Sequence, residues 1–233
     1  MWDSLTTYIG SLGTIGKVIE IIALNIVLSG DNAVVIALAC RGLPPAQRNM
    51  GIALGAGVAV VLRVIFTVII ASLLNVPFLR IVGAVLLVWI AIKLLTEEPG
   101  DDDGIAASDK LWKAVQTVAI ADIVMSLDNV LAIAAVAKDS IPLLITGLVI
   151  SIPLIVAGAS LITKLLERFP ILIWAGAGLL GWVAGEMLDS DPFLINSFGA
   201  DLLHKLEYPA AIAGAAIVLG IGYLIRRRRG AHA

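Results

Sequence analysis

The chain has 233 residues, of which 60% are hydrophobic and 15% are charged, and its mean hydropathy is +1.02. Soluble domains are about 45–50% apolar and roughly 25% charged, so this composition is typical of a polytopic membrane protein. The formal net charge of -2 identifies no partner, and the basic run at residues 226–229 follows an apolar segment, where it indicates a stop-transfer anchor rather than nucleic-acid binding.

Seven apolar segments are long enough to cross a bilayer, which requires about 20 residues per helix. The connections between them carry turn residues such as Pro44, Pro77 and Pro170. A polar linker at residues 97–113, acidic at its start, separates the third segment from the fourth. The sequence therefore predicts an all-α polytopic membrane protein with seven transmembrane helices. In chain order the segments are 18–40, 50–74, 78–96, 114–137, 142–163, 170–188 and 208–225.

The polar residues of these segments repeat along the chain. A shift of 97 residues superposes Asn25, Ser29, Asp31 and Asn32 on Asp122, Ser126, Asp128 and Asn129. A shift of 93 superposes Pro77, Gly83 and Trp89 on Pro170, Gly176 and Trp182. Three helices per repeat is an odd number, so the second repeat enters the membrane from the opposite face. We predict two inverted repeats, as in many secondary transporters, within one transmembrane domain over 1–233: repeat one at 18–96, the linker at 97–113, repeat two at 114–188, and a seventh helix at 208–225.

The distribution of basic residues predicts how the chain crosses the membrane, because cytoplasmic loops are enriched in lysine and arginine. With the C-terminus in the cytoplasm, eleven basic residues lie on the cytoplasmic face and four lie outside. Arg63 is the remaining one, deep within the second segment. We therefore expect the N-terminus outside and the C-terminus inside. The predicted cytoplasmic set is Arg41, Arg48, Lys93, Lys110, Lys113, Lys164, Arg168 and residues 226–229.

The repeated aspartates indicate an ion site within the membrane. An aspartate at the centre of a transmembrane helix costs roughly 2.5–3.5 kcal/mol, so two of them at equivalent positions favour a function. Oxygen donors suit Mg²⁺, Ca²⁺ and Mn²⁺, whereas Zn²⁺ and copper sites usually recruit His or Cys, and neither residue type lies in this group. The candidate metal ligands are Asp31, Asn32, Asp128, Asn129, Asp122, Asn25, Ser29, Ser126 and Met125.

Two alternatives stand beside this ligand set. Met125 offers a softer thioether donor, which would disfavour Mg²⁺ and Ca²⁺, but ordinary packing explains it equally well. Asp31 and Asp128 could instead form a buried salt bridge with Arg63. On a straight helix, at about 100° per residue, Asp128 lies roughly 120° from Asp122, so local unwinding of the motif helices would be needed to gather all ligands.

Leu28-Ser29-Gly30-Asp31-Asn32 and Met125-Ser126-Leu127-Asp128-Asn129 resemble the signature pair of the TerC family of bacterial integral membrane proteins. The resemblance covers the chain from about Val18 to Tyr223, and the short, single-domain form is similar to a branch linked to manganese export. It implies a multi-pass protein of the bacterial inner (plasma) membrane. One position departs from the pattern: many relatives carry a glutamate six residues before the first aspartate, where this chain has Asn25. The equivalent residue of the second repeat, Asp122, keeps a carboxylate.

These observations predict a divalent metal ion transporter that exports manganese from the cytoplasm by alternating access. The alternative is a membrane partner that supplies or senses metal ions without net transport. We expect no enzymatic activity and no cofactor, because no nucleotide-binding motif is present and two aspartates alone do not match intramembrane hydrolases. The expected partners are the metal ion, as substrate, and the lipid bilayer; a homo-oligomer is compatible with the sequence.

Overall fold

The computed structural model describes residues 30–73, 76–97, 106–137 and 141–230, with side chains described outside 67–73, 127–137 and 141–147. Every regular element in these ranges is an α-helix, which confirms the predicted all-α class. The helices are α2 (Gly30–Cys40), α3 (Pro45–Leu73), α4 (Leu79–Thr96), α5 (Ala107–Ala137), α6 (Ile141–Arg168), α7 (Ile171–Glu186), α8 (Pro192–Phe198) and α9 (Ala200–Gly230).

The described helices are suited to a membrane. Four stretches are long and apolar enough to span it, namely Pro45–Phe66, Leu79–Thr96, Leu148–Arg168 and Ala200–Arg229, while α2 and α7 are shorter apolar helices. Large apolar side chains such as Val61 and Ile171 are 58% and 71% exposed on the outer surface. Such an apolar exterior is unfavourable in water and favourable in lipid. The protein is therefore a multi-pass membrane protein.

Each of the seven predicted segments overlaps one helix, but several helices begin earlier than their apolar stretch. α3 begins at Pro45, α5 at Ala107 and α9 at Ala200, where the sequence predicted 50, 114 and 208. Their first turns are polar, so hydropathy does not detect them. The short helix α8 was not predicted, although its sequence signal is present: Asp191 is its N-cap and Pro192 its first residue.

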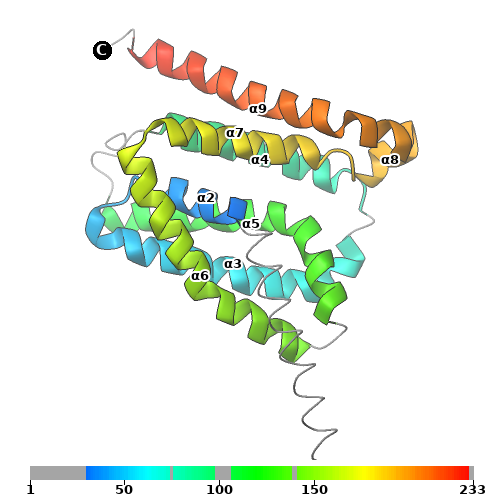
Figure 1. The fold of residues 1–233 in the computed structure, drawn as a ribbon, viewed down its shortest axis with the longest axis horizontal. Helices are drawn as coiled ribbons and strands as arrows, with labels where there is room; N and C mark the ends of the chain where they lie inside the picture. Colours follow the sequence, from blue (N-terminus) through cyan, green and yellow to red (C-terminus); the bar gives the residue numbers. More distant parts are fainter. Residues whose placement is uncertain (1–29, 74–75, 98–105, 138–140, 231–233) are drawn as a thin grey trace, which may run out of the picture.

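The helices lie in successive layers (Figure 1), with α9 beside α4 and α7, then α2 and α5, then α3, while α6 runs obliquely from the level of α7 past α3. Helices at equivalent places in the two predicted repeats contact each other, because α2 packs on α5, α3 on α6 and α4 on α7. The other contacts between the two halves also occur in pairs: α2 packs on α6 as α5 packs on α3, and α2 packs on α7 as α5 packs on α4. An approximate two-fold relation between α2–α4 and α5–α7 would produce this pattern. Their inversion across a membrane stays a prediction.

The two glycines that the sequence comparison paired have equivalent surroundings. A Cβ atom added at Gly83 of α4 would meet Val124 of α5, and one added at Gly176 of α7 would meet Val34 of α2. Each glycine therefore lets its helix approach the first described helix of the other half. The absence of a side chain is what permits this approach in both places.

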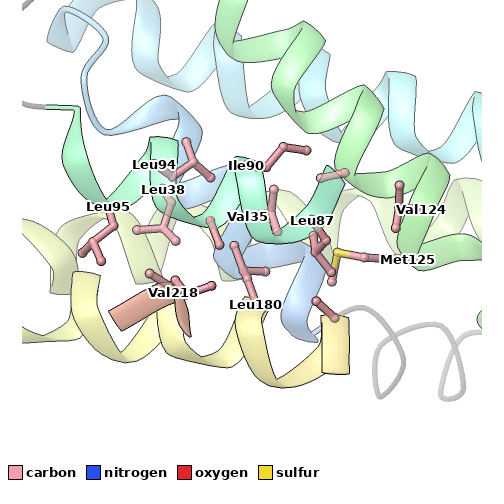
Figure 2. Packing of buried hydrophobic residues seen from close by; sticks show 14 of the residues in the cluster. Val35, Leu38, Leu87, Ile90, Leu94, Leu95, Val124, Met125, Leu180 and Val218 are labelled. Carbon is pink, nitrogen blue, oxygen red and sulfur yellow. The ribbon is translucent and has the colours of Figure 1, made fainter. Parts of the chain in front are cut away.

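The main apolar core joins α2, α4, α5, α7 and α9, with Leu166 of α6 at its edge, and Figure 2 shows part of it. It includes Val35 and Leu38 of α2, Leu87 of α4, Leu180 of α7 and Val218 of α9, together with Val124 and Met125 of α5. A second cluster around Ile36, Cys40 and Ile52 joins α2 and α3 to α5 and α6. Both clusters include residues of α2, so this helix is packed from several sides.

Helix α9 is closely attached to α7 and α4. A Cβ atom at Gly185 of α7 would overlap the carbonyl oxygen of Ala210, and one at Gly181 would lie 2.6 Å from the carbonyl oxygen of Gly214. The backbones of α7 and α9 are therefore in direct contact, as small residues allow in membrane helices. At the C-terminal end of α9, Arg229 Nη1 donates a 3.0 Å hydrogen bond to the carbonyl oxygen of Thr96, at the end of α4.

Asp191 joins the other end of α4 to α8. Its side chain is fully buried, and its Oδ1 accepts hydrogen bonds from the backbone N–H groups of Phe193, at 2.9 Å, and Phe78, at 3.3 Å. Its Oδ2 accepts from the N–H groups of Arg80 and Ile81, at 3.2 and 3.4 Å. One carboxylate thus caps two helix N-termini, where a negative charge is stabilised by the helix dipoles.

Candidate functional site

The structure buries an ion pair between α3 and α5. Arg63 Nη2 of α3 lies 2.9 Å from Asp122 Oδ1 of α5, and the two side chains are 2% and 3% exposed. Ser126, one turn after Asp122, completes the group: its hydroxyl donates to Asp122 Oδ2 at 3.2 Å and accepts from Arg63 Nε at 3.4 Å. Both carboxylate oxygens of Asp122 therefore have a partner, as a buried charge requires.

Asp31 of α2 lies within electrostatic range of this group, where the charge of Arg63 attracts it and the carboxylate of Asp122 repels it. Its Oδ1 accepts the backbone N–H of Asn32 at 2.8 Å, and the side chain is half-buried. The two predicted repeats thus each place a carboxylate near a single guanidinium.

Asn32 adds a buried amide beside Asp31. The residue is 4% exposed, and neither its Oδ1 nor its Nδ2 has a hydrogen-bond partner in the described part of the chain. Leaving a buried polar group unpaired costs about 1–3 kcal/mol, so such groups in native proteins usually have a bound water or ion as partner. Among the described residues, the amide of Asn32 therefore has donor and acceptor capacity that could serve an ion or a water.

The other predicted ligands divide into two sets. Asn25 and Ser29 lie outside the described residues. Asp128 and Asn129 lie on the backbone of α5, six and seven residues after Asp122, and their side chains lie outside the described part. Their roles as ligands stay predictions.

Met125 lies next to Ser126 but is 4% exposed in the main apolar core (Figure 2), among residues such as Leu87 and Val124. This environment fits the packing alternative. The expected local unwinding does not occur in α5, because the helix runs unbroken from Ala107 to Ala137, through the whole second motif.

Sequence reasoning identified Arg63 but not its described partner. The alternative raised from the sequence was a salt bridge with Asp31 or Asp128, whereas the pair that the structure describes is with Asp122. The rotation of α3 relative to α5 determines which carboxylate the Arg63 guanidinium reaches. That rotation cannot be predicted from a single sequence. The sequence singled out Asp122 only through its place in the repeat, where it is equivalent to Asn25 of the first half.

One further group of metal-ligating side chains occurs among the described residues, and it lies elsewhere. Single ligand atoms of Asp189, His204 and Glu207 lie within 4.8 Å of one another, near the junction of α7 and α9. The His204 side chain is 82% exposed, and its Nδ1 lies 3.2 Å from Glu207 Oε2, three residues along the same helix. Exposed pairs of this kind are common on helix surfaces.

Comparison with protein families decides where the chain belongs. Residues 11–230 match the Integral membrane protein TerC family, and this range includes both motifs and every described helix. The chain belongs to the TerC family. This family is associated with ion transport or tellurite resistance.

Relatives of this TerC protein include membrane proteins of Bacillus subtilis (strain 168) and Escherichia coli. YjbE, an uncharacterized membrane protein of the former, is 42% identical over 75% of this chain and 80% of its own length. YceF of the same organism is 28% identical over 98% of this chain and 89% of its own. The UPF0053 inner membrane protein YoaE of E. coli K12 is 25% identical over 66% of this chain and 33% of its own. No solved structure matches the chain.

Proposed function

We propose that this TerC protein is a divalent metal ion transporter that exports manganese from the cytoplasm by alternating access between its two halves. The observation that carries the proposal is the buried amide of Asn32, which lacks a partner among the described residues and adjoins the carboxylate of Asp31. Amide and carboxylate oxygens are ligands that Mn²⁺ accepts. Polar groups within the apolar segments of a membrane protein are expensive, which favours a functional role for them.

The formal charges of the site favour a divalent cation. The buried ion pair with Arg63 balances the charge of Asp122. Asp31 and, six residues beyond Asp122, Asp128 then leave two formal negative charges. A divalent cation would neutralise them, whereas an oxyanion such as tellurite would be repelled. Asp31, Asp128 and the two asparagines that follow them would be the principal ligands, with Asn25, Ser29 and Ser126 completing the shell.

Alternating access would follow from the way the site is divided. Asp31 and Asn32 belong to the first half, and Asp122, Ser126 and Asp128 to the second. A relative movement of the halves would therefore change the access to the ion and the number of its ligands together. Because ligand carboxylates must be ionised, exchange of metal against protons is the natural coupling. We further propose the bacterial inner membrane as the location, with the C-terminus cytoplasmic, no enzymatic activity, and the metal ion and lipids as partners.

Transport by the purified protein in liposomes tests the proposal. Mn²⁺ entry, followed by a metal-quenched dye inside the vesicles, should require the protein and should be lost in Asp31→Asn and in Asp128→Asn. Asp201→Asn removes an exposed carboxylate from the first turn of α9 and is the matched control, expected to transport normally. Mg²⁺, Ca²⁺ and tellurite provide the selectivity series.

Two results would count against the proposal, the first against transport and the second against the assigned site. Mn²⁺ binding without flux in the wild type would favour the alternative, a membrane protein that supplies or senses metal ions. Normal flux in a well-expressed Asp31→Asn variant would remove that aspartate from the site. Comparing binding, by isothermal titration, with flux in the same preparation distinguishes these two outcomes.

A further inference from the structure

A small cavity of mixed polar and apolar lining lies between α4 and α5. It has a volume of about 140 Å³ and is lined by Trp89, Ile90 and Lys93 of α4 and by Lys113, Gln116, Thr117 and Ile120 of α5. At about 100° per helical residue, Lys113 lies on the opposite face of α5 from Asp122. The cavity is therefore separate from the buried ion pair, and it is formed by one helix from each half.

The lining of this cavity favours an anionic ligand. Two lysines approach it from facing helices, and no carboxylate is among its lining residues. Lys93 Nζ lies 3.6 Å from Glu97 Oε1, but both side chains are substantially exposed, so this pair contributes little and leaves the ammonium accessible. The side-chain amide of Gln116, on the exposed surface of α5, adds a neutral donor.

The depth of the cavity matches the headgroup region of a bilayer. Lys93 lies three residues before the end of α4 at Thr96, and Lys113 lies six residues after the start of α5 at Ala107. At about 1.5 Å per residue, both lie within roughly 5–9 Å of a helix end. Trp89 is 55% exposed beside Lys93, and tryptophan is enriched at this level of membrane proteins. Both lysines belong to the face that we predict to be cytoplasmic.

We propose that this cavity binds the phosphate of an anionic phospholipid from the cytoplasmic leaflet. Lys93 and Lys113 pair with the phosphate, Gln116 donates a hydrogen bond, and the acyl chains follow the apolar surface at Ile120. Basic pockets between transmembrane helices on this side of the membrane are suited to anionic headgroups. Because the two lysines come from different halves, the bound lipid joins α4 to α5.

Native mass spectrometry of the delipidated full-length protein tests the proposal. Phosphatidylglycerol and phosphatidylcholine with identical acyl chains are added separately, and the wild type should prefer phosphatidylglycerol. The double substitution Lys93→Gln/Lys113→Gln should weaken phosphatidylglycerol binding roughly 30-fold, the effect of two basic groups near an anionic surface, without changing phosphatidylcholine binding. The double substitution Lys110→Gln/Lys164→Gln removes the same charge outside the cavity and should change binding less than about twofold.

Two further variants separate the site from general charge and from misfolding. Lys93→Arg/Lys113→Arg keeps both charges and should retain the preference. Ile120→Trp keeps both lysines but fills the cavity, and should lose it. Three results would overturn the proposal: no preference in the wild type, an equal loss in the Lys110/Lys164 control, or displacement of the lipid by soluble glycerol phosphate at comparable concentration, which would identify a soluble phosphate as the occupant.

Discussion

Substitution of Arg63 by glutamine removes the positive charge from the buried cluster while keeping a side chain that donates hydrogen bonds. Asp122 then remains buried without its ion-pair partner, 2.9 Å away in the wild type. Breaking a buried pair in this way costs about 3–5 kcal/mol. Ser126 still donates to Asp122, which offsets about 1 kcal/mol of that cost. We therefore expect a net loss of about 3 kcal/mol in the free energy of unfolding.

The loss is measurable as a shift in thermal unfolding. At about 2–4 °C per kcal/mol for a chain of this size, Arg63→Gln should lower Tm by roughly 6–12 °C in detergent without metal. Asp122→Asn should also destabilise, because it leaves the guanidinium buried and uncompensated. The double variant Arg63→Gln/Asp122→Asn contains neither charge, so it should be more stable than Arg63→Gln alone. The coupling energy should lie between about 0.5 and 3 kcal/mol.

Manganese affinity provides a second measurement, because Arg63→Gln should raise the affinity for Mn²⁺ while it lowers the stability. Without Arg63 the site has three formal negative charges from Asp31, Asp122 and Asp128, so a divalent cation should bind more tightly although the protein is less stable. A site that was merely misfolded would lose affinity and stability together. Strictly additive effects of the two substitutions, or weaker Mn²⁺ binding by Arg63→Gln, would refute the view that Arg63 is the resident counter-charge of this site.

Three further predictions concern the framework around the site. Gly185→Leu should destabilise the protein by about 2–4 kcal/mol, because the introduced leucine side chain would overlap the backbone of α9. Gly178→Ala should be tolerated, because the added methyl group makes only ordinary contacts. Urea or heat unfolding of both variants measures the difference. Asp191→Ala should cost about 2–4 kcal/mol by uncapping two helices, and Asp191→Asn should cost less, since one oxygen still accepts. In a Cys40→Ala background, Ser197→Cys on exposed α8 should react with an impermeant thiol reagent added outside intact cells; labelling only after lysis would reverse the predicted orientation.

The fold could be predicted from the sequence to the extent that it depends on hydropathy. Apolar stretches of about 20 residues located α2 to α7 and α9, since lipid imposes that length, while the count of seven transmembrane helices stays a prediction. They did not locate the polar first turns of α5 and α9, which hydropathy assigns to loops although they are helical. They also missed α8, which is too short to carry a periodic signal and depends on a local cap at Asp191.

The sequence predicted which residues belong to the candidate site, but not which of them form the buried ion pair. Repetition of the motif indicated that Asp122 is equivalent to a ligand position, and Arg63 was evident as a basic residue deep in an apolar segment. Their pairing depends on how α3 and α5 are rotated and staggered against each other, which results from packing along both helices. The unpartnered amide of Asn32 was equally invisible, because a missing hydrogen bond is a property of the surroundings rather than of the residue.

The attachment of α9 determines where the two halves can separate. α9 packs on α4, from the first half, and on α7, from the second, and Arg229 ties its far end to Thr96. Together with the junction at Asp191, these contacts hold the halves together along one edge, so under the proposed alternating access we expect that edge to be the hinge axis. The opposite edge, at α3 and the N-terminal part of α6, lies farthest from α9 (Figure 1). The ion pair described between these two helices, Arg48 with Glu167, is partly exposed and contributes little. Spin labels placed across α3 and α6 should therefore report a larger change in distance upon Mn²⁺ binding than labels placed across α4 and α7.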